Sequence, residues 1–186
     1  SEFMRNIQSA FARWFNRLFK RKGRFWADRF KSTLLMDSQA VLDAMLYVDL
    51  NGVRAGLVER PEDFAGCSAH LRASRKAKWL LPLSEVMDKG LGSYYQEYKG
   101  LLYYRGAVPT KSHQAAIPMQ VLKREEERGF KESGVYLKKF RYFTDGLALG
   151  ASELVLEQLA RLRDAGHFLR RKNPIEQEEG CQHSLR

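Results

Sequence analysis

The chain of 186 residues carries a net charge of +10, from 32 Lys and Arg against 22 Asp and Glu, and 44% of its residues are hydrophobic. This composition suits a folded protein of one domain or two small ones. No apolar run approaches the roughly 18 residues of a membrane span, which excludes a transmembrane segment. The two cysteines, Cys67 and Cys181, lie far apart. They exclude a disulfide scaffold and a Cys-rich zinc site, and they fit a reducing, cytoplasmic location.

The positive charge is concentrated near the N-terminus. Residues 5–31 contain nine basic residues and a single acid, Asp28. The basic residues are Arg5, Arg13, Arg17, Lys20, Arg21, Lys22, Arg24, Arg29 and Lys31. This local excess indicates an anionic partner, either nucleic acid or a membrane surface. Residues 1–3, before Met4, resemble the scar of a cloning site and are excluded from the fold argument.

Residues 5–20 predict an amphipathic helix. Its apolar residues recur every three to four positions at Ile7, Phe11, Trp14, Phe15 and Leu18. Three interpretations stay open: a helix packed on a core with a solvated basic face, a phosphate-tracking surface, and a basic membrane-surface helix. The alternation of aromatic with basic residues over 24–31 favours the phosphate-tracking surface.

The next elements are a strand and a helix. Residues 25–36, rich in aromatic and branched side chains, predict one extended segment. Asp37 or Ser38 is expected to cap a helix that runs to about Asn51, where Asn51-Gly52 is a stop signal. Residues 59–82, with two prolines and a group of basic residues, are expected to form a loop.

The C-terminal half also has a helical pattern. The tyrosines of residues 83–104 recur at helical spacing, which favours a core or interface over a stacking platform. Residues 119–128 predict a helix whose charged run, 123–128, is a solvated face. Residues 135–143 and 151–164 predict two more helices, a weak helix-turn-helix signal. The polar tail from Asn173 is expected to be frayed.

One helical face carries candidate chemistry. The sequence has no Gly-rich phosphate loop and no nucleophile elbow, and its four histidines are isolated. Asp43, Tyr47 and Asn51 recur at i, i+4 and i+8 and share a stripe of the predicted helix. A tyrosine nucleophile needs a nearby cation or base, because its pKa of about 10 leaves little phenolate at neutral pH. By spacing alone, a polar face with a half-buried tyrosine is the commoner interpretation.

A longer pattern surrounds that face. The stretch 47–58 reads YVDLNGVRAGLV, and residues 60–64 read RPEDF. Together they resemble the HUH-type tyrosine transposases, which include insertion-sequence enzymes and REP-associated tyrosine transposases. Upstream, residues 13–16, 23–26 and 29–32 look like the segments that precede this motif in the family. The resemblance is strong over 11–64, and residues 140–156 are loosely similar to a C-terminal block of longer members.

The resemblance implies a nuclease of DNA transposition. Such enzymes cut single-stranded DNA, often at the foot of a hairpin, through a covalent 5′-phosphotyrosine. Tyr47 matches the nucleophile, and Asn51 matches a residue that helps to hold a divalent metal, Mg²⁺ or Mn²⁺. The expected DNA-binding residues are Arg13, Arg17, Lys20, Arg21, Lys22, Arg24, Trp26, Arg29, Lys31 and Arg54.

Two departures from the family pattern bear on activity. The family has proline after the asparagine, where this chain has Gly52. The His-hydrophobic-His pair that supplies the other metal ligands is missing. In the family that pair precedes everything seen here and lies on the central strands of a ferredoxin-like sheet. We therefore expect one candidate metal ligand, Asn51, and no transposition by this chain alone.

These observations predict a mainly α fold. Residues 4–66 would keep the last helix-strand-helix of an α+β ferredoxin-like transposase domain. A basic linker (67–82), a helical C-terminal region (83–172) and a flexible tail (173–186) would follow. The segment 25–36, without its sheet partners, would pair with itself in a homodimer, be covered by the C-terminal helices, or give up its strand structure.

The expected function is that of a transposase-like DNA-binding protein whose partner is single-stranded or hairpin DNA. The alternative is a non-catalytic interaction protein, or one of anionic membrane surfaces, that uses the basic amphipathic helix.

Overall fold

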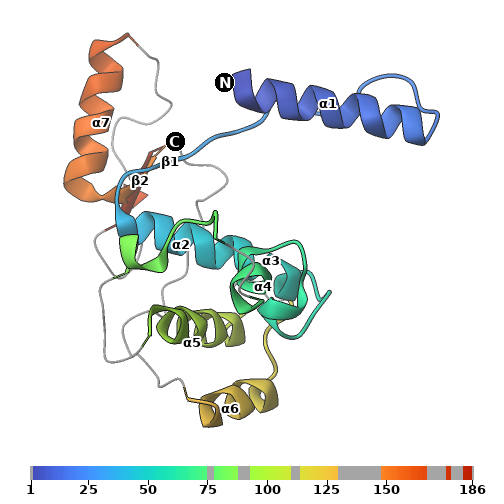
Figure 1. Cartoon of the computed structure of the whole chain (residues 1–186). Coiled ribbons are helices and arrows are strands. Elements are labelled where there is room, and N and C mark those ends of the chain that lie inside the picture. The colour runs from blue at the N-terminus through green and yellow to red at the C-terminus, as the bar shows by residue number, and fades with distance from the viewer. Residues whose placement is uncertain are drawn as a thin grey trace. The chain divides into compact units, whose positions relative to one another are not determined.

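The computed structural model describes residues 2–74, 78–87, 93–109, 114–129 and 148–166, with the backbone alone of 175–176 and 182–185. The described part is mainly helical, with seven α-helices and short strands (Figure 1), as the sequence predicts. The chain divides into two compact units, Ser1–Ser32 and Thr33–Arg186, here called unit 1 and unit 2. This division falls inside the segment 4–66. Among the described residues, no helix is long and apolar enough to cross a membrane.

Unit 1 is built on a single helix, α1 (Glu2–Leu18). The predicted helix of residues 5–20 is confirmed, although α1 also includes two of the residues excluded as a scar. Past its end, Lys20 adopts a positive φ of 50° and the Arg21 N–H donates to the Asn16 carbonyl at 2.8 Å. This left-handed residue ends the helix, because its positive φ interrupts the repeating right-handed dihedral angles.

The extended segment predicted over residues 25–36 is largely wrong. Within it only β1 (Leu34–Leu35) is a strand. Phe25 and Trp26 instead fold back onto α1, with ring centroids of Phe25 and Phe11 5.1 Å apart. The burial of these aromatic side chains against the helix outweighs their preference for extended backbone.

The described strands form one small sheet in unit 2. Its strands are β1, β2 (Ala148–Ala151), β3 (Ile175–Glu176) and β4 (Gln182–Leu185), in the order β1-β2-β4-β3. The β1–β2 pair is parallel, with Leu34 opposite Ala148, and the other pairs are antiparallel. The segment expected to lack sheet partners thus pairs through β1 with the C-terminal part of the chain. The expected frayed tail contains two of the strands.

A single carboxylate joins this sheet to two helices. Asp37 is the N-cap of α2 (Ser38–Asp49), as predicted, and accepts from the Ala40 N–H at 2.7 Å. Its other oxygen accepts from the N–H of Ala151 at 2.6 Å. Ala151 precedes α7 (Ser152–Asp164), the helix predicted at 151–164. The backbone at Gly150 lies close to Met36, since a Cβ on Gly150 would be 2.6 Å from the Met36 Cβ.

The main core of unit 2 lies among helices α2 to α6. The helices are α2, α3 (Asn51–Arg54), α4 (Ser68–Ala73), α5 (Tyr94–Ala107) and α6 (Met119–Glu127), with 3-10 turns at Pro61–Asp63 and Leu83–Glu85. In Figure 1, α5 lies between α2 and α6. The loop predicted over 59–82 is wrong at α4, where Cys67 and Ala69 are buried in the core. Tyr98 and Tyr103 of α5 are fully buried, which confirms the core interpretation of the tyrosine spacing.

Two polar pairs fix α2 against α5. Asp43 and Asp49 lie on the buried side of α2, 2% and 1% exposed. Asp43 accepts from Arg105 at 2.8 Å, while Asp49 accepts from the Tyr98 hydroxyl at 2.7 Å. Because the later residue of α2 pairs with the earlier residue of α5, the two helices run antiparallel. Ser68, at the start of α4, also donates to Asp49, through its backbone N–H at 2.8 Å and through its hydroxyl.

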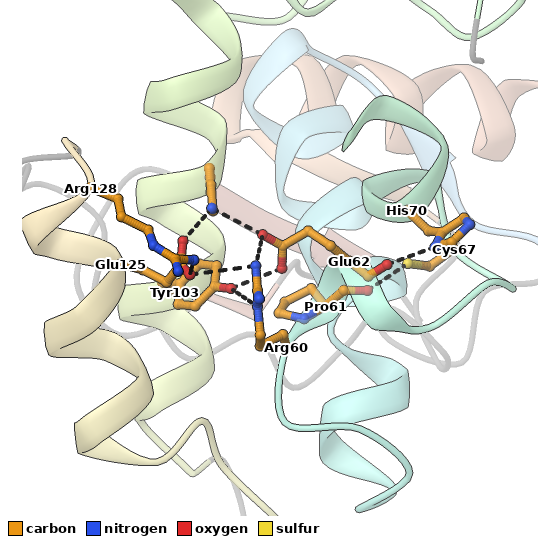
Figure 2. A network of polar contacts seen from close by, with 9 residues as sticks. Arg60, Pro61, Glu62, Cys67, His70, Tyr103, Glu125 and Arg128 are labelled. Atoms are coloured by element: carbon orange, nitrogen blue, oxygen red, sulfur yellow. Dashed lines mark hydrogen bonds and ion pairs between the residues drawn. The ribbon is translucent and has the colours of Figure 1, made fainter. Parts of the chain in front are cut away.

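A second polar network joins the 3-10 turn at Pro61–Asp63 to α5 and α6 (Figure 2). Glu125 of α6 is 2% exposed and forms ion pairs with Lys99, with Arg60 at 3.4 Å and with Arg128 at 2.6 Å. Glu62 forms an ion pair with Lys99 at 3.1 Å and accepts from the Tyr103 hydroxyl at 2.9 Å. The prediction of a solvated face over 123–128 is therefore wrong at Glu125. Buried carboxylates need paired donors, and α5 supplies them.

The network shifts the acidity of its members. Burial and the nearby Glu62 carboxylate raise the pKa of Tyr103, and burial raises the pKa of Tyr95 to about 12. Burial pushes the pKa of Glu125 upward, but the hydrogen bond and ion pair with Lys99, together with the charges of Arg60 and Arg128, outweigh burial and leave that pKa lowered. Glu125 is therefore ionised in the folded protein at neutral pH.

We predict that Glu125→Gln lowers the free energy of unfolding by about 3 kcal/mol at neutral pH, because the largely covered ammonium of Lys99 loses one of its two acidic partners. The lowered pKa of Glu125 means that its contribution is present above the ordinary value of 4.5 and is lost as the pH falls through the folded-state value. When the pH is lowered from about 7 to about 3, the free energy of unfolding should therefore fall less in the variant than in wild type. Urea denaturation followed by far-UV circular dichroism measures both effects.

The matched control is Glu157→Gln, which removes a surface ion pair with Arg161 whose side chains are 58% and 70% exposed. This control should cost less than about 0.5 kcal/mol. If Glu125→Gln were as stable as Glu157→Gln, the network around Glu125 would not stabilise the fold as we predict.

We also predict that Asp37→Ala lowers the free energy of unfolding by about 2 kcal/mol, because α2 loses its cap and the Ala151 N–H loses its acceptor. Asp37→Asn should have an intermediate effect, since one amide oxygen replaces two carboxylate oxygens. The same urea titration measures both variants. An asparagine variant as stable as wild type would show that the bond to Ala151 contributes nothing.

Candidate functional site

The candidate nucleophile lies on the exposed side of α2. Tyr47 is 40% exposed, and Asn51 follows one turn later, also exposed. Leu50, between them, has right-handed helical angles (φ −83°, ψ −6°), and its N–H bonds to the Leu46 carbonyl at 3.0 Å. Helical geometry therefore continues from α2 into α3, so Tyr47 and Asn51 occupy neighbouring turns of one helical path.

Asp43 does not belong with this pair at the surface. The shared stripe expected for Asp43, Tyr47 and Asn51 runs from the interior to the outside, because Asp43 is buried in its ion pair with Arg105. The sequence spacing is right, but the packing of α5 covers one end of the stripe. The exposed part of the candidate site is thus Tyr47 with Asn51.

α2 ends at Asp49, close to the end predicted near Asn51, but Asn51-Gly52 is not a stop signal, because α3 begins at Asn51 and includes Gly52. Gly52 is buried against the ring of Phe64, and a Cβ on it would lie 2.7 Å from the Phe64 Cγ. The glycine therefore permits a close approach of this ring to the helix. Positive φ comes four residues later, at Gly56, where the helix has already ended.

The donor set around Asn51 does not fit a metal ion. Among the described residues, no three His, Cys, Asp or Glu side chains converge as metal ligands. His70 bonds through Nδ1 to the Glu62 carbonyl at 2.7 Å, so it serves the fold. The side chains of His113, His167 and His183 lie outside the described residues. The Mg²⁺ or Mn²⁺ implied by the resemblance thus has one candidate ligand in the described part, Asn51.

The basic residues of unit 1 are at its surface. Every one of the nine between Arg5 and Lys31 is exposed, including the predicted DNA-binding residues Arg13, Arg17, Lys20, Arg21, Lys22, Arg24, Arg29 and Lys31. Exposed, closely spaced cations raise the local concentration of anionic ligands and bind phosphate with strong salt dependence.

An aromatic cluster supports these cations. Phe11 and Phe15 of α1 contact Phe25, with ring centroids 5.1 and 4.7 Å apart, and Phe25 meets Trp26 edge-on at 4.7 Å. The Trp26 indole N–H donates to the carbonyl of Gln8 at 3.0 Å, which fixes the orientation of the ring. Trp26 is still 42% exposed. Edge-on and tilted ring pairs of this kind add stability beyond their buried area.

A groove of about 770 Å³ opens beside this cluster, within unit 1. It lies between α1 and the segment of residues 23–30, and the lining includes Arg5, Gln8, Arg24, Trp26, Arg29 and Phe30. Arg5 was counted in the sequence as part of the basic excess but was missed as a site residue. Arg5 is distant from Arg24 and Arg29 along the chain, so the sequence does not indicate that they line one groove. The one available signal is the i, i+3 spacing of Arg5 and Gln8, which puts both on one helix face.

Arg54 differs from the other predicted DNA-binding residues. It lies in unit 2 and is partly buried, and its guanidinium donates to the carbonyls of Arg105 at 2.8 Å and Ala115 at 3.5 Å. Burial and the neighbouring Arg105 lower its pKa. Its donors hold α3 to α5, so we leave Arg54 out of the candidate DNA surface. The helix predicted at 135–143, half of the helix-turn-helix signal, lies outside the described residues.

Comparisons of the chain with protein-family models, with curated proteins and with solved structures find no match.

We predict that Tyr47→Phe changes the free energy of unfolding by less than about 0.5 kcal/mol, because the side chain is at the surface. Tyr98→Phe should lower it by about 1.5 kcal/mol, because Asp49 loses a buried donor. Urea denaturation of the two variants in parallel measures the difference. Equal losses would mean that Tyr47 also has a structural role and is not a clean probe of chemistry.

Proposed function

We propose that the protein is a transposase-like DNA-binding protein that recognises single-stranded or hairpin DNA, with Tyr47 as a nucleophile that needs the family's paired metal-binding histidines, a pair that the given sequence does not contain. One observation carries the proposal. The two residues that the resemblance assigns to the chemistry, Tyr47 and Asn51, are exposed on neighbouring turns of a helix whose other face is packed in the core.

Unit 1 supports the DNA-binding half of the proposal. A groove lined by arginines and aromatic rings combines the two contacts that single strands need, phosphate neutralisation and base stacking. The order α1, β1, α2 also agrees with the helix-strand-helix remnant of a ferredoxin-like domain, the finer part of our fold prediction. In that interpretation β2 is the parallel neighbour of the remnant's strand, β1.

The proposed step at Tyr47 is a phosphoryl transfer. The phenolic oxygen of Tyr47 would form a bond to phosphorus as the bond between phosphorus and the 3′ oxygen of the preceding nucleotide breaks. The phenol proton passes to solvent or a base, and the leaving oxygen takes a proton to become a 3′ hydroxyl. The 5′ end stays on the protein as a phosphotyrosine, which conserves the bond for rejoining.

We predict that the whole chain binds a labelled hairpin with a single-stranded tail more tightly than a matched duplex, as measured by fluorescence anisotropy. Log affinity should fall linearly with log salt, with a slope of several, since each phosphate contact to a single strand contributes about 0.7. Equal and weak binding to both ligands would refute the DNA-binding half of the proposal.

Tyr47→Phe tests the catalytic half. The variant should bind the hairpin like wild type but form no covalent adduct when a transposase fragment that carries the paired histidines is added. Adduct formation is read by denaturing gel electrophoresis with labelled DNA. A Tyr47→Phe protein that still forms the adduct would remove Tyr47 as the nucleophile.

A second candidate function rests on a different face of α1. Ile7, Trp14 and Leu18 are 47%, 56% and 58% exposed and recur along one strip beside basic residues. Such a strip is typical of helices that lie on anionic membranes. Flotation with anionic liposomes, together with no measurable DNA affinity, would make this the better account.

A further inference from the structure

The groove of unit 1 places cations and rings around one opening. Arg24, Trp26 and Arg29 come from the segment after α1, and Arg5 and Gln8 come from α1 itself. Helical spacing puts Ser9 and Ala12 on the same side of α1 as Arg5, and both line the groove. Their small side chains leave room for a ligand between the helix and the facing segment.

The rings of the groove are held before any ligand arrives. The hydrogen bond from Trp26 to Gln8 and the edge contact with Phe25 fix the indole. The Arg29 guanidinium lies 5.9 Å from the centroid of the Phe30 ring, so a cation and a ring are paired at the groove. A preorganised site loses less side-chain freedom when it binds, which favours affinity.

The electrostatics select an anion with a flat apolar part. Three arginines line the groove against one acid, Glu2, whose carboxylate is paired with Arg5 at 3.1 Å. The volume of about 770 Å³ lies within the range of about 300–1,000 Å³ typical of ligand pockets. Arginine and exposed aromatic rings together match the phosphate and base of a nucleotide.

We propose that this groove holds one or two nucleotides of single-stranded DNA, with phosphate on Arg24 and Arg29 and a base against the rings of Trp26 and Phe30. The inference rests on the proposed DNA binding and deepens it, because it separates a defined nucleotide site from the general basic surface of unit 1. Arg13 and Arg17 are the reference for that surface. They lie on the same helix as Arg5, and the groove lining of unit 1 does not include them.

The test compares two double variants of the full chain that remove the same charge. Arg24→Gln with Arg29→Gln should weaken binding to a hairpin with a single-stranded tail by at least about tenfold and reduce the salt slope by about 1.4. Arg13→Gln with Arg17→Gln, which removes the same charge from the general basic surface, should weaken binding by a clearly smaller factor than the groove variant does. All four side chains are exposed, so both variants are expected to fold, and circular dichroism verifies it.

A base-deleted ligand tests the stacking part. Replacing the tail nucleotides by abasic residues keeps every phosphate and should weaken wild-type binding by at least about fivefold. Trp26→Leu should bind the two tails almost equally, while Trp26→Phe keeps a ring and should retain most of the preference. Wild type that does not distinguish the tails would overturn the stacking contact.

The outcomes separate the two proposals. If the two double variants weaken binding equally, the groove is not a nucleotide site, while DNA binding by the basic surface stands. If wild type binds neither tail at low salt, the proposed DNA binding itself fails. A larger loss for the groove variant, with discrimination against the abasic tail, supports the inference.

Discussion

The structure of unit 2 depends on the burial of two carboxylates. Asp43 and Asp49 face the core from α2, and each is stable there because α5 brings a donor to it, Arg105 to the first and the Tyr98 hydroxyl to the second. An unpaired carboxylate in this position would cost several kcal/mol, so only one register of the two helices is compatible with the sequence. Hydrophobic contact alone, from residues such as Leu46 and Leu102, would tolerate neighbouring registers.

The same constraint sets what α2 presents to the outside. With Asp43 and Asp49 turned inward, Tyr47 and Asn51 are exposed on neighbouring turns. Gly52, the residue after Asn51, lets the ring of Phe64 pack against the helix. The candidate nucleophile is therefore placed by interactions on the other side of its own helix, and α5 is a positioning element for it. The second network, at Glu62 and Glu125, extends this anchoring from α5 to α6.

Unit 1 follows a different physical logic. Its aromatic rings cluster around Phe11, Phe15 and Phe25, whereas the core of unit 2 combines aliphatic residues such as Leu46 with the buried tyrosines of α5. The rings give the short unit enough buried area to order the segment of residues 23–30 on α1. The exposed cations are thereby presented from a shaped surface with a groove. In our proposal, this groove is what would distinguish recognition of a nucleotide from general attraction to phosphate.

The sequence by itself determined what is local. The helices α1, α2, α6 and α7, the Asp37 cap and the charge excess of residues 5–31 all follow from side-chain periodicity, capping chemistry and composition. Tertiary structure decided what depends on partners distant in the chain. Leu34 pairs with Ala148, Arg54 bonds to the Arg105 carbonyl, and Glu125 is buried within a charged run. Arg5 meets Arg24 and Arg29 at the groove for the same reason. No rule of sequence spacing predicts such contacts, because burial and pairing are properties of the packed chain. A polar residue has the same identity in the sequence whether or not another element covers it in the fold.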